Sequence, residues 1–308
     1  MKINRRDGVA LILTIFVISV LSAVVLEFSD ESMQEATLSA YSRDSALTLE
    51  ICRSLIDIER ARLEDDENRN MDSFKEEWAE MEILDELMEL PEGCSMTMTV
   101  QDEQGKLNIN MLLDPHGKDN KERIEQFSRL MDILKLDKKL LNTLLDWLDP
   151  DDIERLDGAE DFYYSSLPIP YSCGNKRFLT PFQIFLVKGF EKLYENLLDY
   201  ITIYSDGKIN INTAPKEVLM SLSDRIDESI AKNILEYRED KEFEDINELK
   251  EVPGIDSSLF SEIRPYITVK SNTFSLIAKS RCKDTENIIR AVLKRKNKGS
   301  DILYWRVM

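Results

Sequence analysis

The chain has 308 residues, of which 43% are hydrophobic, so it can form one large domain or two ordinary ones and is not a disordered chain. Acidic residues outnumber basic ones by 59 to 40, and the formal net charge is −19. Affinity for nucleic acid comes mainly from cationic side chains that displace counterions, so we expect no nucleic-acid ligand; divalent cations or basic partners suit this chain better.

The N-terminal segment predicts a membrane anchor. Residues 9–26 form an apolar run in which only Thr14, Ser19 and Ser22 are polar. Eighteen residues make a helix of about 27 Å, which is enough to cross a bilayer core. Two arginines precede the run and acidic residues follow it, which places the N-terminus in the cytoplasm and the rest of the chain outside. The alternatives are a cleaved secretory signal, whose apolar region is usually shorter, and a buried core helix, which rarely has basic flanks.

The helical pattern continues beyond the apolar run. After residue 27 the apolar residues narrow to a stripe at spacings of three and four, and residues 9–90 contain neither proline nor glycine. This predicts one helix of about 50 residues or more. Two abutting helices are the alternative, with residues 29–32 as a cap. Residues 64–90 are strongly acidic and carry an apolar face that includes Trp78, which predicts a short second helix in a loop.

Strand patterns lie on both sides of a long insertion. Apolar and polar residues alternate over 94–101, and the same alternation returns over 274–278 and again between 288 and 307. One sheet can therefore form from both sides of an insertion at roughly 105–268.

Four cysteines lie far apart, without a Cys-x-x-Cys pair: Cys52, Cys94, Cys173 and Cys282. They do not indicate a zinc site. Outside the cytoplasm one or two disulfides can form, and a full set allows three pairings.

The insertion contains an internal repeat, with copies at about 105–204 and 207–268. Lys-Leu-Asn-Ile-Asn at 106–110 recurs as Lys-Ile-Asn-Ile-Asn at 208–212, and further segments follow in the same order. The number of residues that separates a segment of the first copy from its match in the second decreases twice along the chain. The first copy therefore contains extra residues in two places. Each copy predicts a short strand or turn followed by three or four helices, and together they predict a compact all-α subdomain.

The second copy resembles a helix-hairpin-helix module of DNA-binding proteins, which holds phosphate on the backbone N–H groups of glycine-rich hairpins. It departs from the binding form, because Asp256 stands where the second hairpin glycine belongs and residues 222–226 contain no glycine. Residues 209–268 also carry fourteen acidic against seven basic residues. A membrane-tethered DNA-binding protein is therefore the alternative function, and the charge argues against it.

The extra residues of the first copy include an acidic stretch. Residues 146–161 contain eight carboxylates, interrupted by Pro150 and Gly158. Calcium takes six to eight oxygen ligands from such segments, although the spacing is not that of an EF-hand. The candidate ligands are Asp149, Asp151, Asp152, Asp157, Glu160 and Asp161. A solvated acidic loop is the alternative; a hydrolase that uses two of these carboxylates is less consistent, since no hydrolase or P-loop motif occurs in the chain.

These residues together resemble a known family. The basic leader that ends at Gly8 resembles a type IV prepilin signal, with cleavage expected between Gly8 and Val9. The long helix followed by a sheet resembles the pilin architecture. The motifs at 102–110, 147–149, 158–164, 170–171 and 209–213 resemble the minor pseudopilin GspK of the type II secretion system, over nearly the whole chain.

The resemblance implies an α+β fold, with a pilin-like N-terminal helix on an antiparallel sheet and a large inserted all-α domain made of two helix-hairpin-helix-like repeats. The expected parts are a prepilin leader (1–8), a transmembrane segment (9–26), a helix with an acidic loop and the first strand (27–104), the inserted domain (105–268), and C-terminal strands that complete the sheet (269–308).

The implied function is that of a non-enzymatic subunit that caps the pseudopilus tip and helps to initiate its assembly. The implied partners are the minor pseudopilins I and J, the inner membrane, and secreted cargo or the outer-membrane channel. Calcium in the acidic region, a methylated mature N-terminus and a periplasmic body in a Gram-negative bacterium are further implications.

Leu13 is the fifth residue after the expected cleavage site, where most pilins have a glutamate. That carboxylate is thought to pair with the N-terminal amine of a neighbouring subunit, and unpaired in lipid it would be costly. A subunit without a predecessor does better without it, so Leu13 supports a place at the tip.

Overall fold

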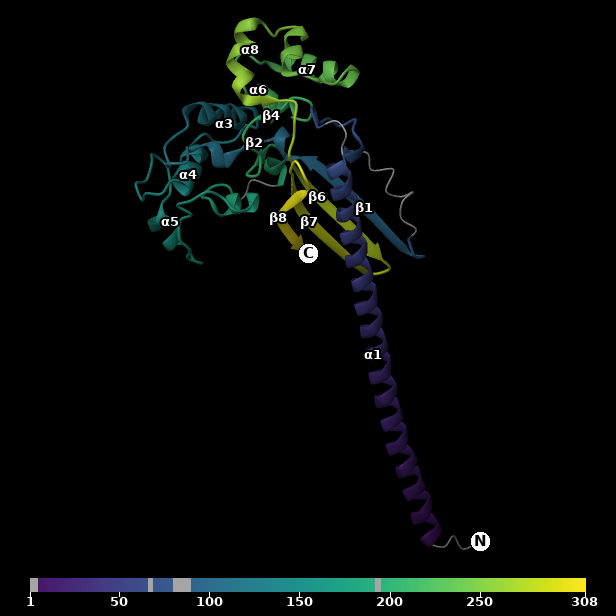
Figure 1. The fold of residues 1–308 in the computed structure, drawn as a ribbon. Coiled ribbons are helices and arrows are strands. Elements are labelled where there is room, and N and C mark those ends of the chain that lie inside the picture. The colour runs from purple at the N-terminus through teal and green to yellow at the C-terminus, as the bar shows by residue number, and fades with distance from the viewer. Residues whose placement is uncertain (1–4, 66–68, 80–89, 192–194) are drawn as a thin grey trace.

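The computed structural model describes residues 5–65, 69–79, 90–191 and 195–308, and it shows a body at the end of one long helix (Figure 1). Helix α1 (Arg5–Asp65) is continuous, so the prediction of a single helix is confirmed and residues 29–32 do not interrupt it. Residues 9–43 of α1 are exposed, and the apolar window near its N-terminus has a mean hydropathy of 3.0. By length and composition this part of α1 is long and apolar enough to cross a membrane.

The second half of α1 packs on an antiparallel sheet. The described residues form four strands in the order β1-β6-β7-β8: Cys94–Asp102, Thr273–Cys282, Thr285–Arg295 and Ser300–Val307. Buried side chains of α1, such as Leu55 and Ile56, form a common core with Leu276 on β6 and with Ile289 and Ala291 on β7. The strands come from both sides of the insertion, as the alternating patterns predicted.

The register between β1 and β6 explains which cysteines pair. Cys94 lies directly opposite Cys282, and the two form a disulfide, whereas Cys52 and Cys173 are free thiols. At the other end of the same strand pair, Asp102 lies opposite Phe274. The insertion therefore leaves the sheet and returns to it at neighbouring points.

The acidic segment between α1 and β1 is only partly described. Trp78 lies in the 3-10 helix η1 (Glu77–Ala79), is 3% exposed and packs against Phe274 with 5.0 Å between ring centroids. The short helix predicted over 64–90 is wrong for residues 69–76, which form turns and irregular backbone, and its parts at 66–68 and 80–89 lie outside the described residues.

The insertion consists of two modules of the same design. The first contains β2 (Leu107–Asn108), η3 (Ile109–Met111), α3 (Lys121–Ile133), α4 (Lys139–Leu148), α5 (Asp161–Ser165), η4 (Pro181–Leu186), η5 (Glu195–Asp199) and β3 (Ile201–Thr202). The second contains β4 (Ile209–Asn210), α6 (Lys216–Ser221), α7 (Glu228–Asp240), η6 (Ile246–Glu251), α8 (Ser257–Ile263), η7 (Arg264–Tyr266) and β5 (Ile267–Thr268). Each module closes with a parallel pair of two-residue strands, β2 with β3 and β4 with β5.

Matching residues of the two modules occupy matching positions. Gly189 and Gly254 both have positive φ, at 86° and 96°. A Cβ atom would clash with Leu140 at the first position and would lie 2.6 Å from Ile230 at the second. Leu140 and Ile230 are themselves equivalent residues of α4 and α7. The repeat in the sequence is therefore a repeat in packing.

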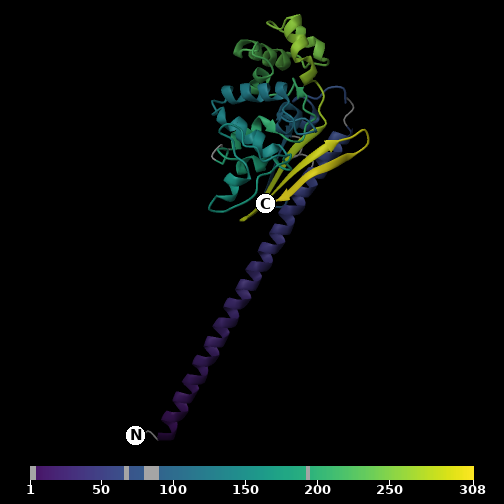
Figure 2. The same cartoon turned by 90° about the vertical axis from the view of Figure 1, so that its left-hand side faces the viewer.

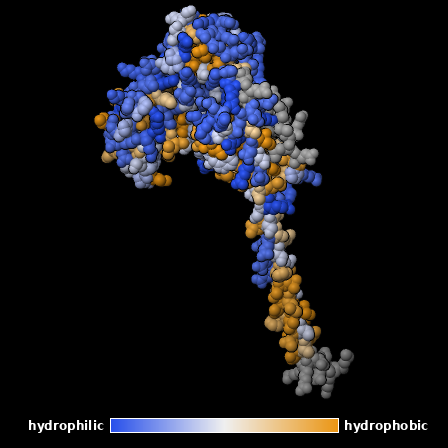
Figure 3. Space-filling view, viewed as in Figure 1, coloured by the Kyte–Doolittle hydropathy of each residue, from blue (hydrophilic) through white to orange (hydrophobic). Residues whose placement is uncertain are grey.

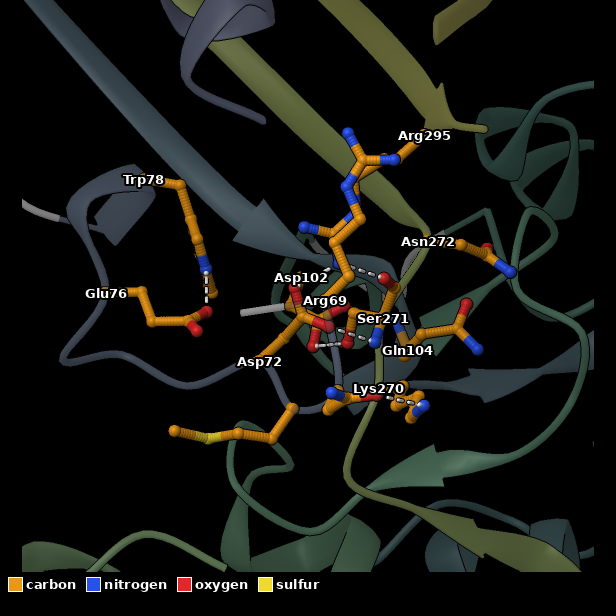
Figure 4. Close-up of polar contacts among 12 residues, drawn as sticks. Arg69, Asp72, Glu76, Trp78, Asp102, Gln104, Lys270, Ser271, Asn272 and Arg295 are labelled. Atoms are coloured by element: carbon orange, nitrogen blue, oxygen red, sulfur yellow. Dashed lines mark hydrogen bonds and ion pairs between the residues drawn. The ribbon is translucent and has the colours of Figure 1, made fainter. Parts of the chain in front are cut away.

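A buried polar network joins the second module to the sheet (Figure 4). Asp102, at the end of β1 and before the 3-10 helix η2 (Glu103–Gly105), accepts hydrogen bonds from Asn210 at 3.1 Å, Thr213 at 2.6 Å and the Ser271 hydroxyl. Asp72 pairs with Arg295 of β7 and accepts the backbone N–H of Ser271 at 2.6 Å.

This network has an electrostatic consequence. Burial raises the pKa of Asp72 to about 7 against the opposing effect of Arg295, and burial also raises the pKa of Asp102. Because each carboxylate contacts several segments, the network fixes how the second module sits on the body. The second module lies at the end of the molecule farthest from the N-terminus (Figures 1 and 2).

Candidate metal centre

The acidic stretch folds back onto helix α4 through one buried carboxylate. Asp146 is 0% exposed and lies between the buried Leu145 and Trp147. Its Oδ2 accepts the backbone N–H of Ala159 at 2.9 Å and that of Arg155 at 3.2 Å. These bonds close the loop that follows α4, and they explain how a charged residue is held inside the module.

Arg155 supplies the positive charge of this site. Its Nη1 contacts Asp146 at 2.8 Å and also pairs with Asp149, while its Nη2 lies 3.0 Å from Asp119. These carboxylates raise the pKa of Arg155 above its usual value against the effect of burial, so the guanidinium remains charged. Arg155 therefore compensates part of the buried negative charge.

The remaining charge is carried by oxygens without a partner. One oxygen each of Asp146, Asp149 and Glu160 lie within 4.8 Å of one another, and all three residues are buried. Among the described residues, neither oxygen of Glu160 has a hydrogen-bond donor, nor does Oδ1 of Asp149. Burial, reinforced by the charges of Asp146 and Asp149, raises the pKa of Glu160 to about 7, and burial also raises the pKa of Asp149.

This donor set fits a hard cation. Calcium binds carboxylate oxygens at 2.3–2.6 Å, and three oxygens within 4.8 Å of one another can share one such ion. A buried carboxylate without a hydrogen-bond donor is costly, and an ion would neutralise Glu160 and Asp149 together. Asp146, Asp149 and Glu160 are the residues that would hold it.

The structure brings together two of the six predicted ligands, Asp149 and Glu160. Asp151 and Asp152 lie on the exposed outer part of the loop. Asp151 accepts the backbone N–H of Ile153 at 2.9 Å, and Asp152 accepts a hydrogen bond from the Asn175 side chain at 2.9 Å. Both carboxylates therefore stabilise turns at the surface.

The other two predicted ligands also have different neighbours. Asp157 is exposed, has a positive φ of 61° and lies 3.6 Å from Lys139. Asp161, at the start of α5, accepts the backbone N–H of Cys173 at 3.0 Å. The sequence prediction missed Asp146, although a carboxylate in the middle of the apolar run Leu144–Leu148 of α4 was the available signal.

The residues of the predicted leader site lie at the opposite end of the molecule. Gly8 belongs to the first turns of α1, and Val9 and Leu13 are 67% and 63% exposed. Expected cleavage at Gly8 thus falls near the end of α1 that is farthest from the body (Figure 2).

The comparisons with known proteins agree with this architecture. The family model "Type II secretion system (T2SS), protein K" matches residues 105–206, and the helix-hairpin-helix motif model matches residues 205–268. Type II secretion system protein K of Aeromonas hydrophila is 25% identical over 95% of this chain and 94% of its own length. The Klebsiella pneumoniae protein K is 21% identical over 88% of this chain and 87% of its own length.

Another relative is covered less completely. The putative type II secretion system protein K of Escherichia coli K12 is 24% identical, over 68% of this chain and 66% of that protein. Among solved structures, the crystal structure of the GspK-GspI-GspJ complex from enterotoxigenic Escherichia coli contains a chain that matches with a TM-score of 0.66 at 20% identity, over 90% of this chain and 98% of that one.

The long helix on an antiparallel sheet, interrupted by two helical modules, defines a pilin-like fold with a large insertion. The family model lies within this inserted domain, and the relatives extend the match over nearly the whole chain. The chain is thus similar to type II secretion system protein K along most of its length.

Proposed function

We propose that the chain is a non-enzymatic minor pseudopilin that caps the tip of the pseudopilus and helps to initiate its assembly for protein export across the outer membrane. The observation that carries this proposal is the position of the inserted modules: the second lies beyond the sheet, at the end of the body opposite the exposed helix, and the first lies beside the sheet (Figure 1). They would obstruct a further subunit stacked on that end, whereas the exposed part of α1 leaves room for subunits alongside or below.

The partners in this proposal are pseudopilins of types I and J. A solved structure with the same fold is a GspK-GspI-GspJ complex, which supports a similar complex here. Exposed apolar residues continue along α1 beyond the predicted membrane span, at Met33, Leu38 and Tyr41, and they provide a surface on which neighbouring helices can pack.

The membrane part of the proposal concerns residues 1–26. A prepilin peptidase would remove residues 1–8, and α1 from Val9 would span the inner membrane with the body in the periplasm. Leu13 supports a first position in the filament, because a subunit without a predecessor has no amine to neutralise a carboxylate at this depth.

Mass spectrometry of the full chain, isolated from membranes of its own cells, tests this proposal. We expect a mature N-terminus at Val9 with a methylated amine, and a Gly8→Val variant that keeps its leader as the matched control. An intact Met1 in the native chain, or cleavage near Ala23, would contradict the proposal. Co-purification with I-type and J-type subunits from the same cells tests the complex independently of processing.

Calcium belongs to this proposal as a structural ion. The unpaired oxygens of Glu160 and Asp149 support it, since an ion shared with Asp146 would supply the missing positive charge. When bound, it would hold the loop after α4 closed and would take no part in a reaction.

A DNA-binding role for the second module is disfavoured by a specific contact. Asp256 accepts the backbone N–H of Leu259 at 2.7 Å at the start of α8 and also pairs with Arg225. A carboxylate therefore occupies the position at which this type of hairpin would hold a phosphate. Binding of duplex DNA at low salt, lost as salt is raised, would revive this alternative.

A hydrolase is disfavoured by access. Asp149 and Glu160 are 2% and 4% exposed, so a substrate bond cannot come between them without opening the loop. Turnover that disappears in an Asp149→Asn variant would contradict the non-enzymatic role.

A further inference from the structure

The two modules differ sharply in their exposed apolar side chains. Between residues 105 and 268 the large apolar side chains that are exposed all belong to the first module. Four of them lie close together in the sequence: Ile153 is 75% exposed, Leu156 83%, Phe162 89% and Ile169 82%. In the second module, described in full over residues 207–268, no large apolar side chain is exposed. The extra segment of the first module thus adds apolar surface that the shared design does not require.

This surface is held in place by hydrogen bonds. Arg155, between Ile153 and Leu156, is fixed to the buried Asp146 by both its backbone N–H and its guanidinium. The carbonyl of Leu156 accepts a hydrogen bond from Asn142 of α4 at 2.9 Å. The loop therefore presents its apolar side chains from a fixed backbone, although burial would normally be preferred for them.

The part of the surface that contains Phe162 and Ile169 is anchored to the residues around Asp146 as well. Phe162 is in α5, shortly after the buried Glu160, and Asp161 accepts the backbone N–H of Cys173. The thiol of Cys173 donates to the backbone carbonyl of Asp146 at 3.7 Å. Both halves are thus anchored to the residues around Asp146. Figure 3 shows apolar residues at the outer edge of the otherwise hydrophilic lobe that contains α5.

The charge around these side chains determines what can cover them. Residues 149–170 contain seven carboxylates and one arginine, and four of the carboxylates are exposed: Asp151, Asp152, Glu154 and Asp157. An anionic membrane surface or a nucleic acid would be repelled. A protein segment that combines apolar side chains with lysine or arginine satisfies both the apolar and the acidic parts of the surface.

We propose that residues 151–169 form a docking surface for a basic, apolar segment of another protein. The apolar side chains Leu156 and Phe162 would contribute the buried contacts, and the exposed carboxylates would select the partner by charge. This surface lies on the inserted domain and does not depend on the assembly proposed above.

Site-specific photo-crosslinking of the full chain in its own cells tests the proposal. A photo-reactive phenylalanine replaces Leu156 or Phe162, and the matched control replaces Lys232, which is exposed on α7 of the second module. We expect a protein crosslink at both test positions, and the crosslinked peptide, identified by mass spectrometry, should contain lysine or arginine next to apolar residues.

Charge reversal provides the second measurement. Glu154→Lys should lower the crosslink yield at Leu156 at least threefold, whereas Glu239→Lys on the second module should leave it unchanged. Both residues are exposed, so the unfolding temperature of each variant should equal that of the native chain. Crosslinks to lipid, crosslinks to an acidic segment, a yield no higher than at Lys232, or an unchanged yield in Glu154→Lys would each overturn the proposal. Co-purification with I-type and J-type subunits, measured on the same cells, reports the assembly separately.

Discussion

Asn110 and Phe178 exchange two hydrogen bonds: Nδ2 of Asn110 donates to the Phe178 carbonyl at 2.9 Å, and the Phe178 N–H donates to Oδ1 of Asn110 at 2.8 Å. In the second module Asn212 and Phe243 exchange the same pair, at 3.0 and 2.9 Å. Asparagine suits this exchange because its side-chain amide can donate from Nδ2 and accept at Oδ1 at the same time. The repeated Asn-Ile-Asn pattern therefore records a structural element that stabilises a loop in each module.

Replacing either asparagine should destabilise the chain. Asn110→Ala or Asn212→Ala leaves the N–H and the carbonyl of a buried phenylalanine without partners, which costs about 2–4 kcal/mol of the free energy of unfolding. Chemical denaturation of the full chain in detergent measures this loss. The exposed Asn297→Ala is the control and should change the free energy by less than about 0.5 kcal/mol. A similarly small change at both buried asparagines would show that the exchange contributes little.

Stability should depend on pH through Glu59. This residue of α1 is 1% exposed, and burial raises its pKa to about 7, while Arg62 opposes the shift. Because the pKa in the folded chain exceeds that in the unfolded chain, the stabilising contribution is complete below about pH 4 and is lost as pH rises through about 7. Glu59→Gln should therefore equal the native chain near pH 4 and exceed its free energy of unfolding by on the order of 2 kcal/mol at pH 8.

The control for this prediction lies on the same helix. Glu50 is 70% exposed, and Glu50→Gln should leave the pH profile of the native chain unchanged. If the free energies of unfolding of the native chain and Glu59→Gln change with pH in parallel, the pKa of Glu59 is the same in the folded and the unfolded chain, which would contradict the prediction.

Removal of calcium should lower the unfolding temperature of the full chain. An ion that binds only the folded state stabilises it by about 3 kcal/mol at a hundredfold excess over its Kd. Glu160→Gln should reduce the difference between calcium and EGTA, and Arg155→Met should increase it, because Asp146 and Asp149 then lose their internal cation. Asp151→Asn, at the surface of the same loop, should behave like the native chain. Equal unfolding temperatures with calcium and with EGTA would leave the carboxylates as a protein-only ion-pair cluster.

Reduction of the disulfide should also lower stability. The bond joins two cysteines with a sequence separation of 188, and cross-links of this kind stabilise by about 2–4 kcal/mol. We expect reductant to lower the native unfolding temperature to that of a variant with Cys94→Ser and Cys282→Ser. The same variant should not respond to reductant. An unchanged native temperature would show that strand pairing between β1 and β6 is sufficient.

Patterns with many repeats of one period were predictable from the sequence. The single helix α1 followed from an apolar stripe without proline or glycine, and the sheet followed from alternation over 94–101 and 274–278. The paired modules were visible because the asparagines of 106–110 and 208–212 make the same contacts. Each of these features depends on local spacing, which a sequence displays directly.

Features that depend on tertiary contact were not predictable. The two-residue parallel strands β2 and β3 are too short to show a period. The pairing of Cys94 with Cys282 required the register of β1 against β6. At the candidate metal centre Asp149 and Glu160 were among the predicted ligands, but Asp146 and the opposing Arg155 were not, since burial rather than spacing brings them together.

The neighbouring positions of Asp102 and Phe274 have a consequence for how such a chain can change. A hairpin turn and a whole inserted domain fit the sheet equally well when each begins and ends at adjacent strands. The entropic cost of closing a loop also grows only slowly with the length of the loop. The body can therefore exchange its insertion for a shorter, longer or unrelated one without re-registering a strand. Diversity among chains with this fold is expected to accumulate at this one junction, while the helix and sheet stay constant.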